Sequence, residues 1–183
     1  MNQTFGAATT YSTGLEIPTF PPDGLLGMGF PPISALRTSP VFQTMLSNGV
    51  VSQGVFGFAL SSASGKSELT IGGTNTNMYQ EATTEYVNVS LPAYWQIRLA
   101  GLSRPGLDDA PDVIVVNTTS YAQAIIDTGT TLIITSDSIA EAYYANVTGA
   151  KPSTEIGGVW TGMSFRVGWC GVFTDALFTI SPV

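Results

Sequence analysis

The sequence predicts an all-β fold with a few short helices, on three observations. Apolar and polar residues alternate through residues 86–91 and 94–99, which is the period of half-buried strands. Residues 55–60 and 68–72 flank a turn rich in Ser and Gly, which favours a hairpin. The chain has 183 residues, of which 44% are hydrophobic and 10% charged, so it can bury a core as one domain or as two small ones.

The first fifty residues predict one short strand and one helix. The segment D-G-L-L-G-M-G at residues 23–29 interleaves glycine with large apolar side chains, which favours a buried strand where another backbone approaches closely. Ser39 and Pro40 are typical of an N-cap and a first helical residue, and Gly49 is typical of a helix end. We therefore expect a helix between Ser39 and Gly49.

The second half of the chain predicts further strands and one more helix. Residues 113–116 favour a strand and residues 117–120 a turn, and the next strand runs into Asp127. Ser136 is expected to cap a second helix, which Gly149 would end.

Composition excludes several classes of function. The chain contains no histidine, which excludes Ser-His-Asp and Cys-His catalysis and every His-ligated metal site. The net charge is −7 and the Lys and Arg residues are scattered, so nucleic-acid binding has no electrostatic support. No apolar run reaches the length of about 18 residues that a membrane span needs. The acidic loop at residues 107–112 lacks the spaced oxygen ligands of a calcium loop and is interpreted as a solvated loop. No metal or other cofactor is expected.

Four Asn-x-Ser/Thr sequons indicate a secreted glycoprotein. They are centred on Asn2, Asn88, Asn117 and Asn146. Residues 1–6 have neither a basic nor an apolar stretch of the kind that begins a signal peptide, so no signal peptide is expected within this chain.

The chemically most informative stretch is residues 121–134, where Asp127 lies between two apolar, β-branched runs. This pattern indicates a strand, a turn and a strand with a carboxylate at the tip, and Gly129 provides a position that can bend sharply. A phosphotransferase of the haloacid-dehalogenase type also places a nucleophilic Asp after an apolar strand. Such an enzyme carries a second Asp two positions later, where this chain has Gly129.

Residues 124–132, with the sequence A-I-I-D-T-G-T-T-L, resemble the second active-site motif of the pepsin-like aspartic proteases. Three other segments support this resemblance and follow the family order. They are the D-G-L-L-G-M-G segment at 23–29, the E-L-x-x-G-G-x-N…Y segment at 68–79, and Y-W-Q-I at 94–97. Together the four segments cover roughly residues 2 to 160 and are most similar to secreted fungal members. The resemblance implies a partial pepsin-like fold.

The resemblance also implies a mechanism and roles for individual residues. In this family two carboxylates share a proton, and one activates a water while the other protonates the peptide carbonyl. Asp127 matches one of them. The Gly129 N–H and the Thr130 hydroxyl are expected to bond to its carboxylate, and the Thr128 hydroxyl to lock the turn to its counterpart across the lobe interface. Two further positions match the primed side of the substrate cleft, namely Ile125 and Tyr94.

The second carboxylate has no counterpart in this sequence, because no other Asp-Thr-Gly or Asp-Ser-Gly occurs. Asp23 matches a structural segment that packs beneath the first catalytic turn, so we do not expect it to be catalytic. Residues 1–88 are accordingly interpreted as the later part of an amino-terminal lobe with interlobe strands, and residues 89–183 as a truncated carboxyl-terminal lobe.

Three functions follow from the resemblance. The first is an aspartic endopeptidase that acts on peptide or protein substrates, is secreted or vacuolar, and needs the missing amino-terminal lobe segment. The second is an inactive pseudo-protease or peptide-binding fragment. The third is a homodimer in which each copy supplies Asp127.

Overall fold

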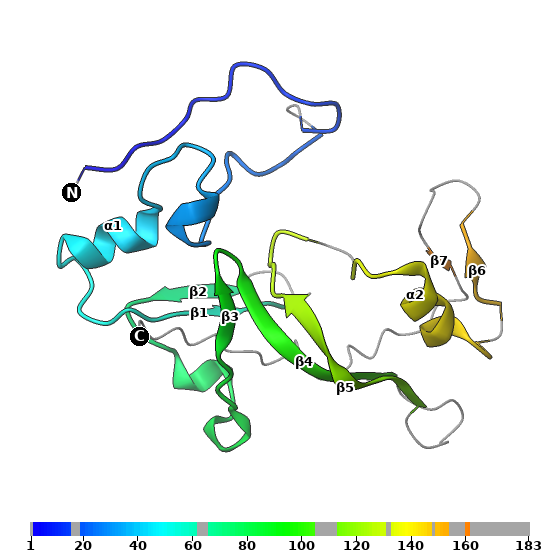
Figure 1. The fold of residues 1–183 in the computed structure, drawn as a ribbon. Coiled ribbons are helices and arrows are strands. Elements are labelled where there is room, and N and C mark those ends of the chain that lie inside the picture. The colour runs from blue at the N-terminus through cyan, green and yellow to red at the C-terminus, as the bar shows by residue number, and fades with distance from the viewer. Residues whose placement is uncertain are drawn as a thin grey trace.

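The computed structural model describes residues 2–15, 19–61, 66–104, 113–130, 133–147, 149–153 and 160–161. Within these residues the chain is mostly strands, with short helices at intervals (Figure 1). The 3-10 helices are η1 (Pro31–Ile33), η2 (Thr76–Met78) and η3 (Glu81–Thr83), and the α-helices are α1 (Val41–Ser47) and α2 (Asp137–Tyr144). The strands are β1 (Phe56–Ala59), β2 (Glu68–Ile71), β3 (Val89–Pro92), β4 (Trp95–Arg104), β5 (Val113–Ile125), β6 (Lys151–Pro152) and β7 (Trp160–Thr161). The expected all-β architecture with a few short helices is confirmed.

The described strands form three antiparallel sheets. The β1–β2 hairpin pairs Phe56 with Ile71, as the Ser/Gly-rich turn predicted. The order β3-β4-β5 makes the largest sheet, and β6 pairs with β7. In Figure 1 the β1–β2 hairpin lies behind β3, and the long β4–β5 pair extends away from it.

The prediction of a turn at residues 117–120 is wrong, because β5 runs through them as one strand. Its antiparallel register against β4 steps from Leu99↔Ala122 to Gly101↔Asn117, so β5 carries extra residues opposite a short piece of β4. The polar run is absorbed as an irregularity of the bulge type, which keeps both strands paired on either side.

The two α-helices begin and end slightly differently from the prediction. Pro40 has an extended backbone and is itself the N-cap of α1, so the first helical residue is Val41, and Ser39 does not cap the helix. Gly49 follows the helix with φ of 65°, the left-handed conformation expected of a helix stop. Helix α2 has Ser136 in the predicted N-cap position, although its side chain makes no capping hydrogen bond. The helix ends at Tyr144, because Ala145 has a non-helical ψ of 132°, and Asn146 follows with a positive φ of 61°.

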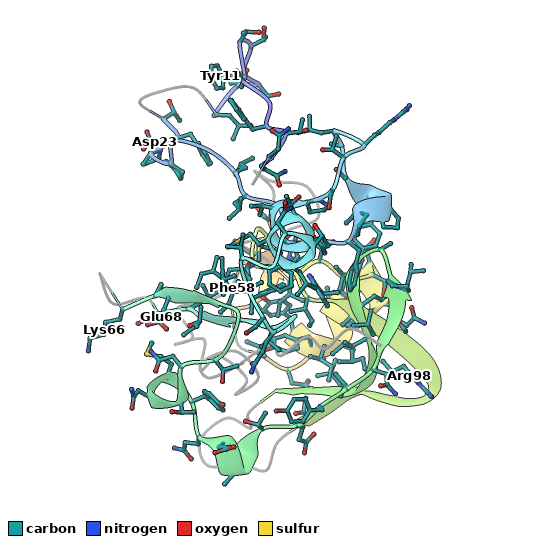
Figure 2. The ribbon with its side chains drawn as sticks, turned by 90° about the vertical axis from the view of Figure 1, so that its left-hand side faces the viewer. Tyr11, Asp23, Phe58, Lys66, Glu68 and Arg98 are labelled. Carbon is teal, nitrogen blue, oxygen red and sulfur yellow. The ribbon has the colours of Figure 1, made fainter. Side chains whose placement is uncertain are left out.

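A small aromatic core lies where α1, the β1–β2 hairpin and the start of β4 meet. Its buried members are Met28, Phe42 and Phe56, and Phe56 is only 1% exposed. Phe42 and Trp95 both pack edge-on against the Phe56 ring, with centroids 4.9 Å and 5.6 Å away. Such tilted pairs are the favoured geometry for aromatic rings. Figure 2 shows Phe58 among the side chains below α1.

The expected buried strand at residues 23–29 does not form. Leu25 is 86% exposed and Leu26 is 60% exposed, and only the end of the segment, at Met28, is buried. A strand needs a neighbouring backbone with which to pair. No strand within the described part of the chain pairs with this segment.

Candidate active site

Asp127 lies directly beyond the end of β5, where the chain leaves the sheet. The Ile126 N–H donates to the Trp95 carbonyl at 2.9 Å, which extends the β4–β5 ladder one residue past the Gln96↔Ile125 pair. At Asp127 the ladder ends, and Thr128 and Gly129 form a turn. The Thr130 N–H then donates back to the Asp127 carbonyl at 3.3 Å. The carboxylate is therefore presented on a tight turn at the end of a paired strand, and it is exposed.

Each oxygen of the Asp127 carboxylate accepts a hydrogen bond from the turn. The Gly129 N–H donates to Oδ1 at 2.9 Å, and the Thr130 hydroxyl donates to Oδ2 at 2.5 Å. Hydrogen bonds to an ionised carboxylate are short and stronger than neutral ones. Because the two donors hold different oxygens, they fix the plane of the carboxylate relative to the turn. These are the two hydrogen bonds that the family resemblance implies.

Glycine at position 129 suits the close approach of its backbone to the carboxylate. A Cβ built on Gly129 would lie 3.2 Å from the Asp127 Oδ1 atom, which is tighter than an ordinary contact. Thr128 is exposed, and its hydroxyl has no hydrogen-bond partner among the described residues. Its expected contact across a lobe interface stays a prediction.

Ile125 and Tyr94 lie at the same end of the β4–β5 pair as the Asp127 turn. Tyr94 immediately precedes β4, and Ile125 is the last residue of β5 and pairs with Gln96. Ile125 is 51% exposed and Tyr94 is 43% exposed, so both offer apolar surface to solvent beside the carboxylate. In Figure 1 the arrowhead of β5 lies close to the β3–β4 turn.

The remaining candidate groups of the sequence are not part of the Asp127 turn. Asp23 is exposed on the long amino-terminal loop, at the edge of the molecule in Figure 2. Among the described residues no three His, Cys, Asp or Glu side chains are grouped closely enough to hold a metal ion. The acidic loop at 107–112 and Cys170 lie outside the described residues.

The four sequon asparagines occupy two kinds of position. Asn2, Asn88 and Asn146 are exposed and lie outside strands and helices. Asn117 lies within β5, opposite Gly101 of β4.

The site has a supporting residue that the sequence pattern did not assign. Trp95 accepts the Ile126 N–H through its carbonyl and donates its indole N–H to the Met28 carbonyl at 2.9 Å. The Y-W-Q-I segment indicated a half-buried strand, but alternation alone does not reveal what an indole N–H binds. A buried or half-buried Trp generally has a hydrogen-bond acceptor for its indole N–H. A Trp in a predicted half-buried strand is therefore the signal that such a contact exists.

The Asp127 turn lies within the part of the chain that matches a known protein family. The model of the eukaryotic aspartyl protease family matches residues 1–170, and this chain belongs to that family. It is 37% identical over 149 residues to an aspartic protease of Phaffia rhodozyma, covering 81% of this chain and 34% of that protein. It is 36% identical over 132 residues to pepsin II-2/3 of Oryctolagus cuniculus, with 72% and 32% covered. With human (Homo sapiens) cathepsin D the identity is 35% over 136 residues, with 72% and 31% covered.

The chain spans about a third of the length of these curated relatives. Among the described residues, the helices are too short or too polar to cross a membrane.

Proposed function

We propose that this chain carries one of the two catalytic carboxylates of an aspartic endopeptidase, and that Asp127 is that carboxylate. The observation that carries the proposal is the turn itself. An exposed Asp at a strand end has both oxygens held by donors from its own turn, Gly129 and Thr130, in a member of the aspartyl protease family.

The chemistry of peptide hydrolysis suits a carboxylate held in this way. One carboxylate takes a proton from a bound water, whose oxygen attacks the peptide carbonyl carbon, while a second, protonated carboxyl donates to the carbonyl oxygen. Two carboxyl groups within hydrogen-bond distance of each other share one proton, because two negative charges so close together are unfavourable. An ionised carboxylate has about four lone-pair sites, so the two donors of the turn leave acceptor capacity for the water.

The substrate in this proposal is a peptide or protein segment bound in extended form. Ile125 and Tyr94 supply apolar surface on the primed side of the cut, supported by their exposure at the end of the β4–β5 pair that leads into the turn. Thr128 would meet the counterpart turn. Residues 1–88 would belong to the amino-terminal lobe and residues 89–183 to the carboxyl-terminal lobe, and an additional amino-terminal lobe segment would supply the second carboxylate.

The proposal is tested on the natural protein that contains this sequence. Hydrolysis of an acid-denatured protein is measured at low pH, with and without a peptide in which a secondary hydroxyl replaces the scissile carbonyl. We expect cleavage that this peptide inhibits and that Asp127→Asn abolishes. Glu81→Gln is the matched control, since it removes one carboxyl charge at an exposed position in η3 and should leave cleavage unchanged. Cleavage that survives Asp127→Asn contradicts the proposal.

A second function, peptide binding without cleavage, is favoured by one observation. The 183 residues contain a single Asp-Thr-Gly and no Asp-Ser-Gly, so these residues supply one such carboxylate. A single carboxylate does not serve as base and acid in the same step. In the same assay, binding of the hydroxyl-containing peptide without any cleavage would favour this function over the first.

We also propose that the protein is secreted or vacuolar and carries N-linked glycans. The exposure of Asn2, Asn88 and Asn146 supports attachment there, because a glycan needs an accessible surface position. Digestion of the natural protein with an endoglycosidase should lower its mass, and mapping of the modified asparagines should find these three. A natural protein without any glycan would contradict this proposal.

A further inference from the structure

Trp95 contacts three separate parts of the molecule. Its indole N–H donates to the Met28 carbonyl at 2.9 Å, and its own carbonyl accepts the Ile126 N–H at 2.9 Å. Its ring lies 4.2 Å from the Phe30 ring and 5.6 Å from the Phe56 ring, measured between centroids. One half-buried residue therefore joins an amino-terminal segment, the aromatic core and the strand end that carries Asp127.

The amino-terminal segment is held against the β3–β4 turn at two points. Besides the indole bond to Met28, the Phe30 N–H donates to the Ala93 carbonyl at 3.2 Å. Between the two points lies Gly29, where a Cβ would come within 2.8 Å of the Ile33 Cδ1 atom and 3.7 Å of the Ala93 oxygen. The lack of a side chain at Gly29 thus leaves room for the Ile33 side chain, while the Ala93 oxygen lies at an ordinary contact distance.

The other side of Trp95 leads directly to the candidate carboxylate. Ile126 immediately precedes Asp127, and its N–H is the last ladder bond before the chain turns. A shift of the Trp95 carbonyl would move Ile126 and with it the start of the turn. The Trp95 backbone is in turn held by the indole hydrogen bond and by the packing of its ring. A displacement of the ring would therefore be passed on to the backbone, since closely packed cores transmit displacements.

We infer that Trp95 is a positioning residue, which fixes the Asp127 turn relative to the segment that ends in Met28, Gly29 and Phe30. The inference rests on the proposed function, in which Asp127 works with a second carboxylate. A residue that ties the Asp127 turn to the amino-terminal half would then set where Asp127 sits relative to that carboxylate. Catalysis depends on such placement, since a displacement of about 1 Å can cost about 100-fold in rate.

The test removes the indole N–H and leaves the rest of the ring. In the natural protein, Trp95 is replaced by benzothienylalanine, which has sulfur in place of the N–H, and separately by Phe. Amide hydrogen exchange is then followed by NMR at Ile126 and Gly129 and at the β1–β2 hairpin. We expect exchange at Ile126 and Gly129 to become about fivefold faster relative to the hairpin, the effect of losing one net hydrogen bond.

The matched control is Phe58→Leu. Phe58 packs on Phe56 with ring centroids 5.8 Å apart and makes no ring contact with Trp95, so this change weakens the same core without touching the indole bond. It should speed exchange at the hairpin at least as much as at Ile126. If the benzothienylalanine chain changes exchange no more at Ile126 and Gly129 than at the hairpin, the inference is wrong. The isosteric replacement covers the case in which Trp95→Phe fails to fold.

A second measurement tests whether the positioning by Trp95 affects catalysis. It also distinguishes a failure of this inference from a failure of the proposed function. In the natural protein, Trp95→Phe should lower kcat while KM stays unchanged, because substrate contacts are kept and only the placement of the carboxylate changes. An unchanged kcat would contradict the inference. The exchange measurement needs no activity. Failure of cleavage in the unmodified natural protein would thus count against the proposed function alone. Unchanged exchange at Ile126 and Gly129 in the Trp95 variants would count against the positioning role of Trp95 alone.

Discussion

The side-chain amide of Asn75 donates to both carboxylate oxygens of Glu68, at 2.9 Å and 3.1 Å. The Thr70 hydroxyl donates to Oε1 of the same carboxylate at 2.7 Å. The Thr70 bond, and after it the Asn75 bonds, lower the pKa of Glu68 below its ordinary value of 4.5. Figure 2 shows Glu68 at the outer edge of the β1–β2 hairpin. A surface carboxylate thus ties β2 to the loop that follows it.

This arrangement predicts how stability depends on pH. Because the pKa of Glu68 is lower in the folded than in the unfolded chain, its contribution to stability is fully present above about 4.5 and is lost as the pH falls through the lowered folded pKa. Glu68→Gln should therefore flatten this acid-side part of the stability curve. The free energy of unfolding, measured by urea denaturation across that range, checks the prediction. Glu81→Gln, which removes an exposed carboxyl charge in η3, is the control. If the free energy of unfolding depends on pH in the same way in both variants, the role assigned to Glu68 is wrong.

Gly72 is predicted to be intolerant of any side chain. Its φ is 81°, its N–H donates to the Val55 carbonyl at 2.7 Å, and a Cβ would meet Val51 Cγ1 at 3.1 Å. The left-handed backbone alone costs an L-residue about 1–2 kcal/mol, so Gly72→Ala should lower the free energy of unfolding by at least that amount. Gly73→Ala is a matched control, since a Cβ at Gly73 would meet no other atom within 4 Å. Equal losses for both variants in thermal denaturation would count against this explanation.

Phe56 is predicted to dominate the core. It is 1% exposed and its ring contacts those of Phe42, Phe58 and Trp95. Phe56→Ala should cost about 3–5 kcal/mol, typical of a buried Phe truncated to Ala. Leu60→Ala removes a side chain that is 51% exposed just beyond β1 and should change stability little. Unfolding free energies for the two variants that differ by less than about 1 kcal/mol would contradict the placement of the core at Phe56.

Thr130 is predicted to matter for catalysis through its hydroxyl. Thr130→Val keeps the shape and removes the donor to Asp127 Oδ2, while Thr130→Ser retains it. In the natural protein, kcat/KM for Thr130→Val should fall roughly 10- to 100-fold, the equivalent of one hydrogen bond to a charged group. Thr130→Ser should keep most of the activity. If the Ser variant loses as much as the Val variant, the hydroxyl is not the relevant feature.

Local patterns predicted the elements whose cause is local. The Ser/Gly-rich turn predicted the β1–β2 hairpin, and alternation predicted β4 from Trp95 onward. Ser136 correctly marked the start of α2. The hydrogen bonds from Gly129 and Thr130 to Asp127 span only two and three residues, so a short motif was enough to imply them.

Elements that depend on distant partners were not predictable in the same way. The polar run at 117–120 looks like a turn, yet it lies inside β5 as a bulge-type irregularity, with Asn117 paired to Gly101 and Ala122 paired to Leu99 of β4. Residues 23–29 have the composition of a buried strand but find no pairing strand in the described part of the chain. The bond from Trp95 to Met28 joins residues 67 positions apart, and no periodicity reports on a contact of that kind.

The indole of Trp95 is also a built-in optical probe. Because its N–H binds the Met28 carbonyl and its ring contacts those of Phe30 and Phe56, we expect its fluorescence to depend on whether the amino-terminal segment is docked. The chain has three Trp residues, and replacing Trp160 and Trp169 by Phe would leave Trp95 as the single emitter. Release of the segment that ends in Met28, Gly29 and Phe30 would then appear as a shift of the emission toward that of water-exposed indole. The docking of this segment can therefore be followed by fluorescence.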